Sequence, residues 1–180
     1  RTLEGRSLIF TALVLLAVLI GGVAEILPTI VIDRAVPLSG AIQQPYRPLE
    51  LHGRDIYVRE GCYVCHSQMV RPFRSEKLRY GDPSLAGEFI YDHPFQWGSK
   101  RTGPDLARVG GRSSDEWHRI HLNNPRDVVP ESNMPAYPWL AKSTVDAASL
   151  PAHMRALRVV GVPYTDAEIA ASVQDVKGKT

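Results

Sequence analysis

The chain has 180 residues, of which 44% are hydrophobic and 22% are charged, and its formal net charge is +2. A charge this close to neutral, without a long run of one sign, gives no support for a nucleic-acid partner. No internal repeat or low-complexity tract divides the chain, and the residues after the N-terminal segments suffice for one domain.

The first predicted element is a transmembrane helix. Residues 8–24 carry no charged side chain, and as a helix they would span about 25 Å, or about 37 Å when extended to Ile32. We therefore predict a signal-anchor helix over residues 1–33, in contact with the lipid bilayer. A cleaved signal peptide is the less favoured alternative, because the polar boundary at Asp33-Arg34 offers no small-residue cleavage site.

The charges in and around this helix bear on its orientation and its neighbours. Arg1 and Arg6 lie on the N-terminal side of its apolar run, and the positive-inside tendency therefore predicts a cytoplasmic N-terminus. Arg34, on the other side of the run, weakens this prediction. Glu25 interrupts the apolar run. Such a side chain is stable in the headgroup zone or against another transmembrane subunit, and the sequence leaves both interpretations open.

An extended linker and then a helix are predicted after the anchor. Residues 34–50 contain three prolines and no sustained periodicity, which indicates a linker rather than a folded element. Residues 51–180 would form one domain. Its first helix is predicted over residues 51–62 and leads into the two cysteines of the chain.

Both cysteines lie in the sequence Cys62-Tyr63-Val64-Cys65-His66, which is the C-x-x-C-H signature of covalent c-type haem attachment. Two thiols one helical turn apart can each form a thioether with a haem vinyl group, and the histidine then lies beneath the iron. The alternatives are a disulfide, a redox dithiol and a zinc site, but a second cysteine pair and a preceding βαβ pattern are missing. Bacteria attach haem c outside the cytoplasm, so the motif agrees with a periplasmic domain on an inner-membrane anchor.

The interval at residues 67–102 is longer than the one that follows the haem motif in a minimal c-type cytochrome. It is rich in basic and aromatic side chains. We interpret it as an insertion that forms a subunit-docking surface, and an exposed loop is the alternative. Arginines at its end and beyond it, among them Arg101, Arg108 and Arg112, are candidates to pair with haem propionates.

The turn Gly103-Pro104-Asp105-Leu106 matches the G-P-x-L turn that small c-type cytochromes share. Its proline carbonyl can accept a hydrogen bond from the second ring nitrogen of the ligating histidine, which fixes the tautomer and raises the basicity of the ligand. We therefore assign Pro104 to the support of His66.

Two capping boxes predict later helices. One lies at residues 113–116 and opens a helix that extends through Asn123, and the other lies at residues 165–168 and opens a terminal helix with an apolar face. No run of alternating strands competes with these patterns, so we expect a mainly α domain.

The second axial ligand of the iron is not determined by spacing. An electron carrier usually keeps its iron six-coordinate, and Met134 lies in a proline-braced loop that would present one thioether. Met69 follows the haem motif too closely, and Met154 suits packing on a helix face. His118 and His121 remain alternatives.

These residues together resemble one family. The chain is similar to the membrane-anchored mono-haem cytochrome c subunit, subunit II, of cbb3-type cytochrome c oxidases, over about residues 8–140. The tail beyond Leu140 matches less clearly. Besides the haem motif, the resemblance rests on residues 23–28, 53–57, 67–74, 91–111, 117–119 and 124–135.

The resemblance implies a mainly α fold, with a single N-terminal transmembrane helix followed by a periplasmic class I cytochrome c-like domain that carries the long insertion. It implies that Cys62 and Cys65 hold one haem c and that His66 and Met134 are its axial ligands. It also implies an interfacial calcium ion, with the loop around Ser99 contributing.

In function, the resemblance implies an electron relay. Such a subunit passes electrons from a dihaem c-type subunit to a haem–copper core subunit, so the chain would serve an oxidase without holding its oxygen site. Two alternatives belong to other classes: a haem enzyme such as a peroxidase, with an open distal position, and a free-standing tethered cytochrome that shuttles electrons between complexes.

Overall fold

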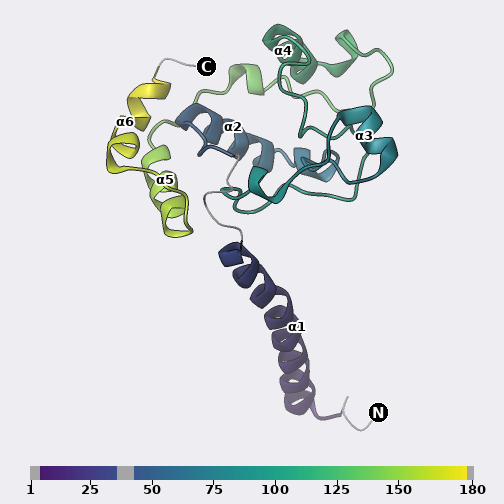
Figure 1. The fold of residues 1–180 in the computed structure, drawn as a ribbon, viewed down its shortest axis with the longest axis vertical. Helices are drawn as coiled ribbons and strands as arrows, with labels where there is room; N and C mark the ends of the chain where they lie inside the picture. Colours follow the sequence, from purple (N-terminus) through teal and green to yellow (C-terminus); the bar gives the residue numbers. More distant parts are fainter. Residues whose placement is uncertain (1–4, 36–42, 178–180) are drawn as a thin grey trace. The chain divides into compact units, whose positions relative to one another are not determined.

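The computed structural model describes residues 5–35 and 43–177, with only the backbone described at residues 29 and 32–35. The chain forms two units, the first ending at Ile42 and the second beginning at Gln43 (Figure 1). Arg1 and residues 36–42 of the predicted linker lie outside the described residues.

The first unit contains one long helix, α1, which spans Ser7–Ala35. Its stretch Ser7–Pro28 is long and apolar enough to cross a membrane, and none of it is buried within the chain. This confirms the prediction that the N-terminal segment forms a helix able to span a membrane. The helix continues two residues past the predicted end at residue 33.

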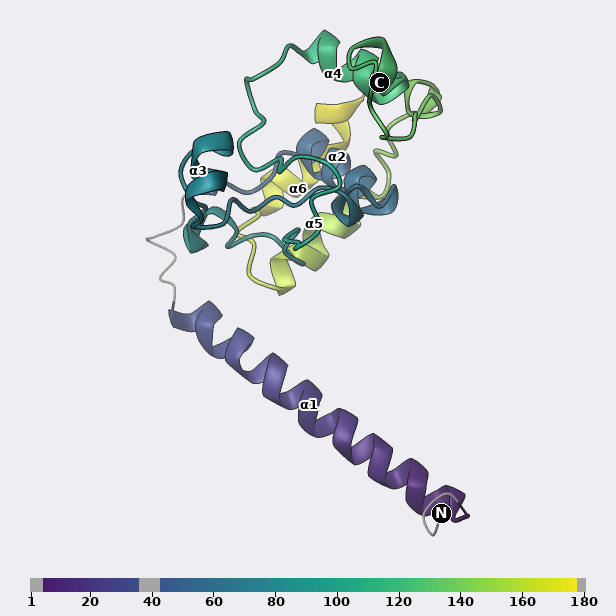
Figure 2. The same cartoon turned by 90° about the vertical axis from the view of Figure 1, so that its right-hand side faces the viewer.

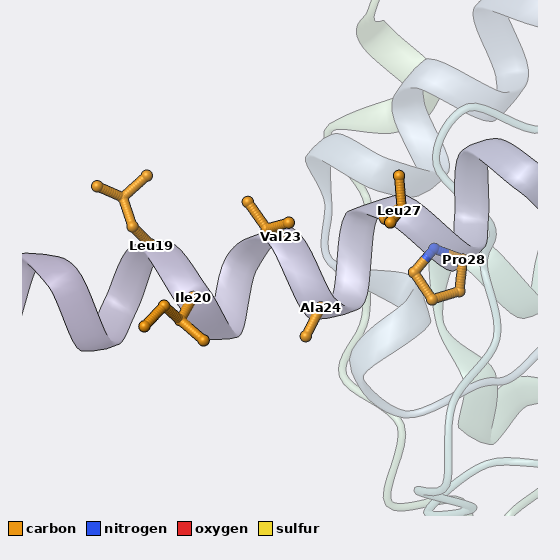
Figure 3. A pocket seen from close by; sticks show the side chains of 6 residues that line it. All are labelled: Leu19, Ile20, Val23, Ala24, Leu27 and Pro28. Atoms are coloured by element: carbon orange, nitrogen blue, oxygen red, sulfur yellow. The ribbon is translucent and has the colours of Figure 1, made fainter.

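The surface of α1 next to Pro28 carries a shallow, open groove with an almost wholly apolar lining (Figure 3). Apolar helix surfaces of this kind are stable in lipid or against another apolar helix. The side chains that line the groove are Leu19, Ile20, Val23, Ala24, Leu27 and Pro28.

The described part of the second unit, residues 43–177, contains five α-helices and no strand. This confirms the mainly α fold, and short 3₁₀ turns connect the helices. The helices are α2 (Pro48–Arg59), α3 (Arg74–Tyr80), α4 (Asp115–Asn123), α5 (Leu150–Val159) and α6 (Asp166–Val176).

The main apolar core of this unit lies between α2, α5 and α6 (Figure 2). Leu51 of α2 packs with Leu150 and Met154 of α5, and Ile169 of α6 belongs to the same buried cluster. Met154 is 1% exposed, which fits the packing role predicted for it. The tail beyond Leu140 therefore completes the core around the helix that leads into the haem motif.

The helix α2 differs from its predicted bounds, residues 51–62, at both ends. It begins at Pro48. Proline is favoured in the first turn of a helix, because the backbone N–H groups of that turn have no helical partner and proline loses nothing by lacking one. The helix ends at Arg59, and Gly61 then adopts a φ of 71°, a left-handed conformation that favours glycine. The chain therefore leaves the helix just before Cys62.

One capping prediction is confirmed and the other is corrected. The Oγ1 of Thr165 accepts the N–H of Glu168 at 3.2 Å, and Oε2 of Glu168 accepts the N–H of Thr165 at 2.7 Å, as predicted for α6. The predicted box at residues 113–116 is wrong, because α4 is capped by Ser114, whose Oγ accepts the N–H of Trp117 at 3.2 Å.

The insertion at residues 67–102 is packed against the rest of the second unit. It includes α3, and Val70 and Tyr80 are buried. Asp92 is buried as well, and its Oδ1 accepts a hydrogen bond from the hydroxyl of Tyr46 at 2.9 Å. The segment is thus not an exposed loop throughout, whereas its role in docking stays a prediction.

Candidate haem-attachment site

The cysteine motif forms a tight turn after α2. The backbone N–H groups of Cys65 and His66 donate to the carbonyl oxygen of Cys62 at 3.2 and 2.9 Å, so all three side chains start from one turn. Both cysteines are free and half-buried. Burial raises the pKa of the Cys62 thiol.

The imidazole of His66 is held by Pro104. Its Nδ1 lies 2.7 Å from the carbonyl oxygen of Pro104. Because a carbonyl oxygen only accepts hydrogen bonds, Nδ1 carries the hydrogen, and Nε2 keeps the lone pair that a metal ligand needs. The two residues therefore meet as the sequence suggested, while the ligation of iron by Nε2 stays a prediction.

Gly103 leaves room for this imidazole. A Cβ atom at this position would lie 2.2 Å from Cε1 of His66, well inside van der Waals contact, so a larger residue would displace the ring. The N–H of Gly103 donates to the carbonyl oxygen of Cys65 at 3.0 Å, and the N–H of Leu106 donates to that of Ser67 at 2.8 Å. The turn is thus bonded to the chain on both sides of His66.

Two buried polar side chains, Ser67 and Asp105, brace this arrangement. The Oγ of Ser67 accepts the N–H of Met69 at 3.2 Å and that of Gly98 at 3.1 Å. Asp105 accepts the N–H of Met69 at 3.1 Å and that of Ala107 at 2.9 Å. The sequence predicts neither role, and the only signal in it is that each residue directly follows a predicted site residue.

A buried ion cluster lies next to this turn. The Nη2 of Arg101 is 3.3 Å from Oε2 of Glu76 and 3.3 Å from Oδ2 of Asp105, and Arg71 also pairs with Glu76. Burial by itself would raise the pKa of Glu76, but the hydrogen bonds from Arg71 and the charges of Arg101 and Arg71 lower it overall. The cluster thus fastens α3 to the segment that follows it.

The three arginines suggested for haem propionates all have partners within the protein. Arg101 belongs to the ion cluster. Arg108 pairs with Glu88, and Arg112 donates to the carbonyl oxygen of Tyr80 at 2.8 Å. In this structure these side chains hold the insertion in place.

Met134 lies in the loop between the 3₁₀ turns Pro125–Asp127 and Leu140–Lys142, and its side chain is half-buried. Its backbone N–H donates to Oγ of Ser132 at 3.2 Å. This local turn presents the thioether from a non-helical segment, as the prolines of the loop suggested.

Tyr137 ties the loop of Met134 to α4. Its N–H donates to the carbonyl oxygen of Leu122 on α4 at 2.9 Å. Burial, followed by the charges of Cys62 and Cys65, raises the pKa of its hydroxyl, so the ring lies within electrostatic reach of both cysteines. A hydrogen bond from Nε1 of Trp139 to Oε2 of Glu60 at 3.2 Å joins the chain just after this loop to the residue two positions before Cys62.

The two alternative axial ligands lie on α4. His121 stacks on Trp117, with 4.6 Å between ring centroids and 11° between ring planes, and His118 meets the same ring edge-on. The Nδ1 of His121 is buried and has no hydrogen-bond partner among the described residues. Burial, followed by the charges of His118 and His66, lowers the pKa of His121.

Ser99, which was assigned to a calcium ion, is exposed. Within residues 5–35 and 43–177, no group of three or more His, Cys, Asp or Glu side chains could hold a metal ion. Calcium takes six to eight oxygen ligands, which can include backbone carbonyls and waters, and the calcium contact of Ser99 stays a prediction.

The donor set fits a covalently bound haem. Two unpaired thiols share one turn with an imidazole whose Nε2 is available, and a thioether lies in a loop tied to the neighbouring helix. These are the attachment groups and axial ligands of c-type haems. Of the predicted residues, Cys62, Cys65, His66 and Pro104 lie together.

Comparison with known proteins gives the same result. The whole chain, residues 1–180, matches the family model described as "Cytochrome C oxidase, mono-heme subunit/FixO". A comparison with curated proteins gave no match. The family match confirms the resemblance seen in the sequence and extends it over the tail beyond Leu140.

Proposed function

Because this chain belongs to the family of mono-haem cytochrome c oxidase subunits, we propose that it relays electrons within a cbb3-type oxidase through one haem c. The observation that carries the proposal is the single turn that holds Cys62, Cys65 and His66, with Pro104 against Nδ1 of His66. When bound, the haem supplies one-electron cycling of its iron.

Each residue of the site has its own task. Cys62 and Cys65 would each hold the haem through a thioether, formed when S–H adds across a vinyl group. His66 would offer Nε2 to the iron, and Pro104 raises the basicity of that nitrogen by accepting the hydrogen bond from Nδ1. Met134 gives a thioether sulfur, which raises the reduction potential relative to a second imidazole.

The proposal includes a place and two electron-transfer partners. The anchor, residues 1–33, lies in the bacterial inner membrane with its N-terminus in the cytoplasm, and the linker 34–50 leads to a periplasmic haem domain, residues 51–180. A dihaem c-type subunit is the donor and a haem–copper core subunit is the acceptor. Oxygen is reduced on the core subunit, so this chain is a non-catalytic relay. A calcium ion at Ser99 would lie at the interface between this chain and the core subunit.

Purification of the chain from its native membranes in a mild detergent tests this function. The chain should co-purify with additional b-type haems and with copper, measured by optical spectra and metal analysis, and should be reduced before the b-type haems when a c-type donor is added. A chain that purifies alone with c-type haem would favour a free-standing shuttle and contradict the proposal.

A further inference from the structure

The chain just after the loop of Met134 is bonded to the start of the cysteine motif. Nε1 of Trp139 donates a hydrogen bond to Oε2 of Glu60 at 3.2 Å, although 79 positions separate the two residues in the sequence. Trp139 lies five residues after Met134, and Glu60 lies two residues before Cys62. This contact therefore joins the segment that carries the proposed distal ligand to the segment that carries the proposed haem attachment.

The acceptor of this bond is held in place by α2. Glu60 caps the C-terminal end of the helix, and its backbone N–H donates to the carbonyl oxygen of Ile56 at 2.8 Å. Its side chain is 16% exposed, and its Oε1 accepts a hydrogen bond from Nε of Arg59 at 3.0 Å. Oε2 is thus left for Trp139, and an ionised acceptor makes a hydrogen bond roughly twice as strong as a neutral one.

The donor of this bond belongs to a turn at the end of the loop. The ring of Trp139 meets the ring of Tyr137 edge-on, with 5.2 Å between centroids. The N–H of Leu140 donates to the carbonyl oxygen of Tyr137 at 3.1 Å, and Oγ of Ser143 donates to that of Trp139 at 3.0 Å. Because Tyr137 is also bonded to α4, the short chain that follows Met134 is attached at two places.

We propose that Trp139 is a positioning residue for the distal ligand: its hydrogen bond to Glu60 holds the loop closed and thereby keeps the sulfur of Met134 on the haem iron. The inference rests on the proposed function, because it takes Met134 as an axial ligand. Loops open locally at a free energy set by the contacts that hold them, so a contact between this loop and the cysteine motif favours the closed, ligated state.

The test uses the full-length chain, purified in detergent with haem attached. Imidazole replaces a methionine ligand on ferric iron only after the methionine leaves, so stopped-flow mixing with imidazole reports on opening of the loop. Trp139→Phe keeps an aromatic ring beside Tyr137 but removes the donor. It should raise the rate constant of imidazole binding roughly three- to tenfold, the factor that one hydrogen bond contributes.

Two further variants and a control separate this role from a general loss of stability. Glu60→Leu removes the acceptor and should raise the rate constant as well, and Trp139→Phe/Glu60→Leu should be no faster than the faster single variant, because both changes remove the same bond. Tyr164→Phe is the control. It removes a hydrogen bond to the carbonyl oxygen of Tyr46 in the second unit and should leave the rate constant unchanged.

An unchanged rate constant in Trp139→Phe, an equal rise in Tyr164→Phe, or additive rises in the double variant overturns the inference. If Trp139→Phe does not retain haem, hydrogen-exchange mass spectrometry of that variant decides. Faster exchange confined to residues 128–138 supports the inference, whereas unchanged exchange there, or faster exchange throughout the second unit, overturns it.

Failure of the proposed function looks different, since the unaltered chain would then carry no covalent haem. If the haem is present but Met134→Ala binds imidazole no faster than the unaltered chain, the assignment of Met134 is wrong, and the positioning role of Trp139 is overturned with it.

Discussion

The segment around His66 and the loop around Met134 are held in place to different degrees. Around His66, hydrogen bonds from Gly103, Leu106 and Tyr57 (2.8 Å) join the contact with Pro104. The loop of Met134 is held mainly by a local turn and by Tyr137. The histidine side is therefore built by the chain itself, and changes there should impair folding, whereas changes on the methionine side should act through ligation.

Breaking the ion cluster on the histidine side should have the largest effect. Arg101→Met leaves Asp105 without its cation and Glu76 with Arg71 alone, and loss of one partner of a buried pair costs up to about 3–5 kcal/mol. Denaturant unfolding of the full chain in detergent measures this loss. Arg119→Met is the matched control, because Arg119 and Glu116 form an exposed pair and should contribute little. If Arg101→Met and Arg119→Met had the same unfolding free energy, the buried cluster would contribute no more than the exposed pair. That result would contradict the claim that the segment around His66 is held in place more firmly than the loop of Met134.

Gly103→Ala should have the next largest effect, because the new Cβ would occupy the space of the His66 ring. We expect a loss of about 1–3 kcal/mol of unfolding free energy together with a lower yield of covalent haem, read from haem-stained denaturing gels. Gly110→Ala is the control, since nothing lies within 4 Å of a Cβ there. Full haem attachment in Gly103→Ala would show that the His66 ring does not depend on this gap.

The ion cluster also predicts how stability depends on pH. The pKa of Glu76 is lowered in the folded chain, so its stabilisation is present above the ordinary glutamate pKa and is lost as the pH falls through the lowered one. Unfolding free energy measured from neutral to acidic pH should fall less steeply in Glu76→Gln than in the unaltered chain. Glu116→Gln should follow the unaltered chain closely, because the lowered pKa of Glu116 comes from a pair with Arg119 that is exposed to solvent and contributes little to stability. Parallel curves for Glu76→Gln and the unaltered chain would mean that this carboxyl is not held as described.

Met134→Ala should have the smallest effect on the fold. The yield of covalent haem and the helical circular dichroism should stay close to those of the unaltered chain, because the thiols and His66 are untouched. The reduction potential should fall, because a thioether ligand raises it. Met69→Ala is the matched control and should leave the potential unchanged, and a fall in Met69→Ala alone would reverse the ligand assignment.

The sequence predicted the features that depend on short spacings. The C-x-x-C-H motif and the capping box of α6 lie within a few residues, so their geometry follows from local rules. The apolar run of α1 is similar, because its length alone indicates a helix that can span a membrane. Even so, α2 begins earlier than predicted, because Pro48, which belongs to a proline-rich stretch typical of a linker, also fits the first turn of a helix.

The features that the sequence did not predict depend on contacts between distant segments. Nothing in the spacing of Glu76, Arg101 and Asp105 says that they share one buried cluster, because each has many possible partners of opposite charge. The packing of the insertion against the rest of the second unit has the same origin. Such contacts arise only when the whole domain is packed.

Peptide mass spectrometry tests the central claim, covalent haem at Cys62 and Cys65, most directly. Trypsin should cleave after Arg59 and Arg74 but not after Arg71, which precedes proline, and so release residues 60–74 of chain isolated from its native membranes. We predict that this peptide carries the mass of one haem. A peptide with free thiols, or with a disulfide between the two cysteines, would contradict it.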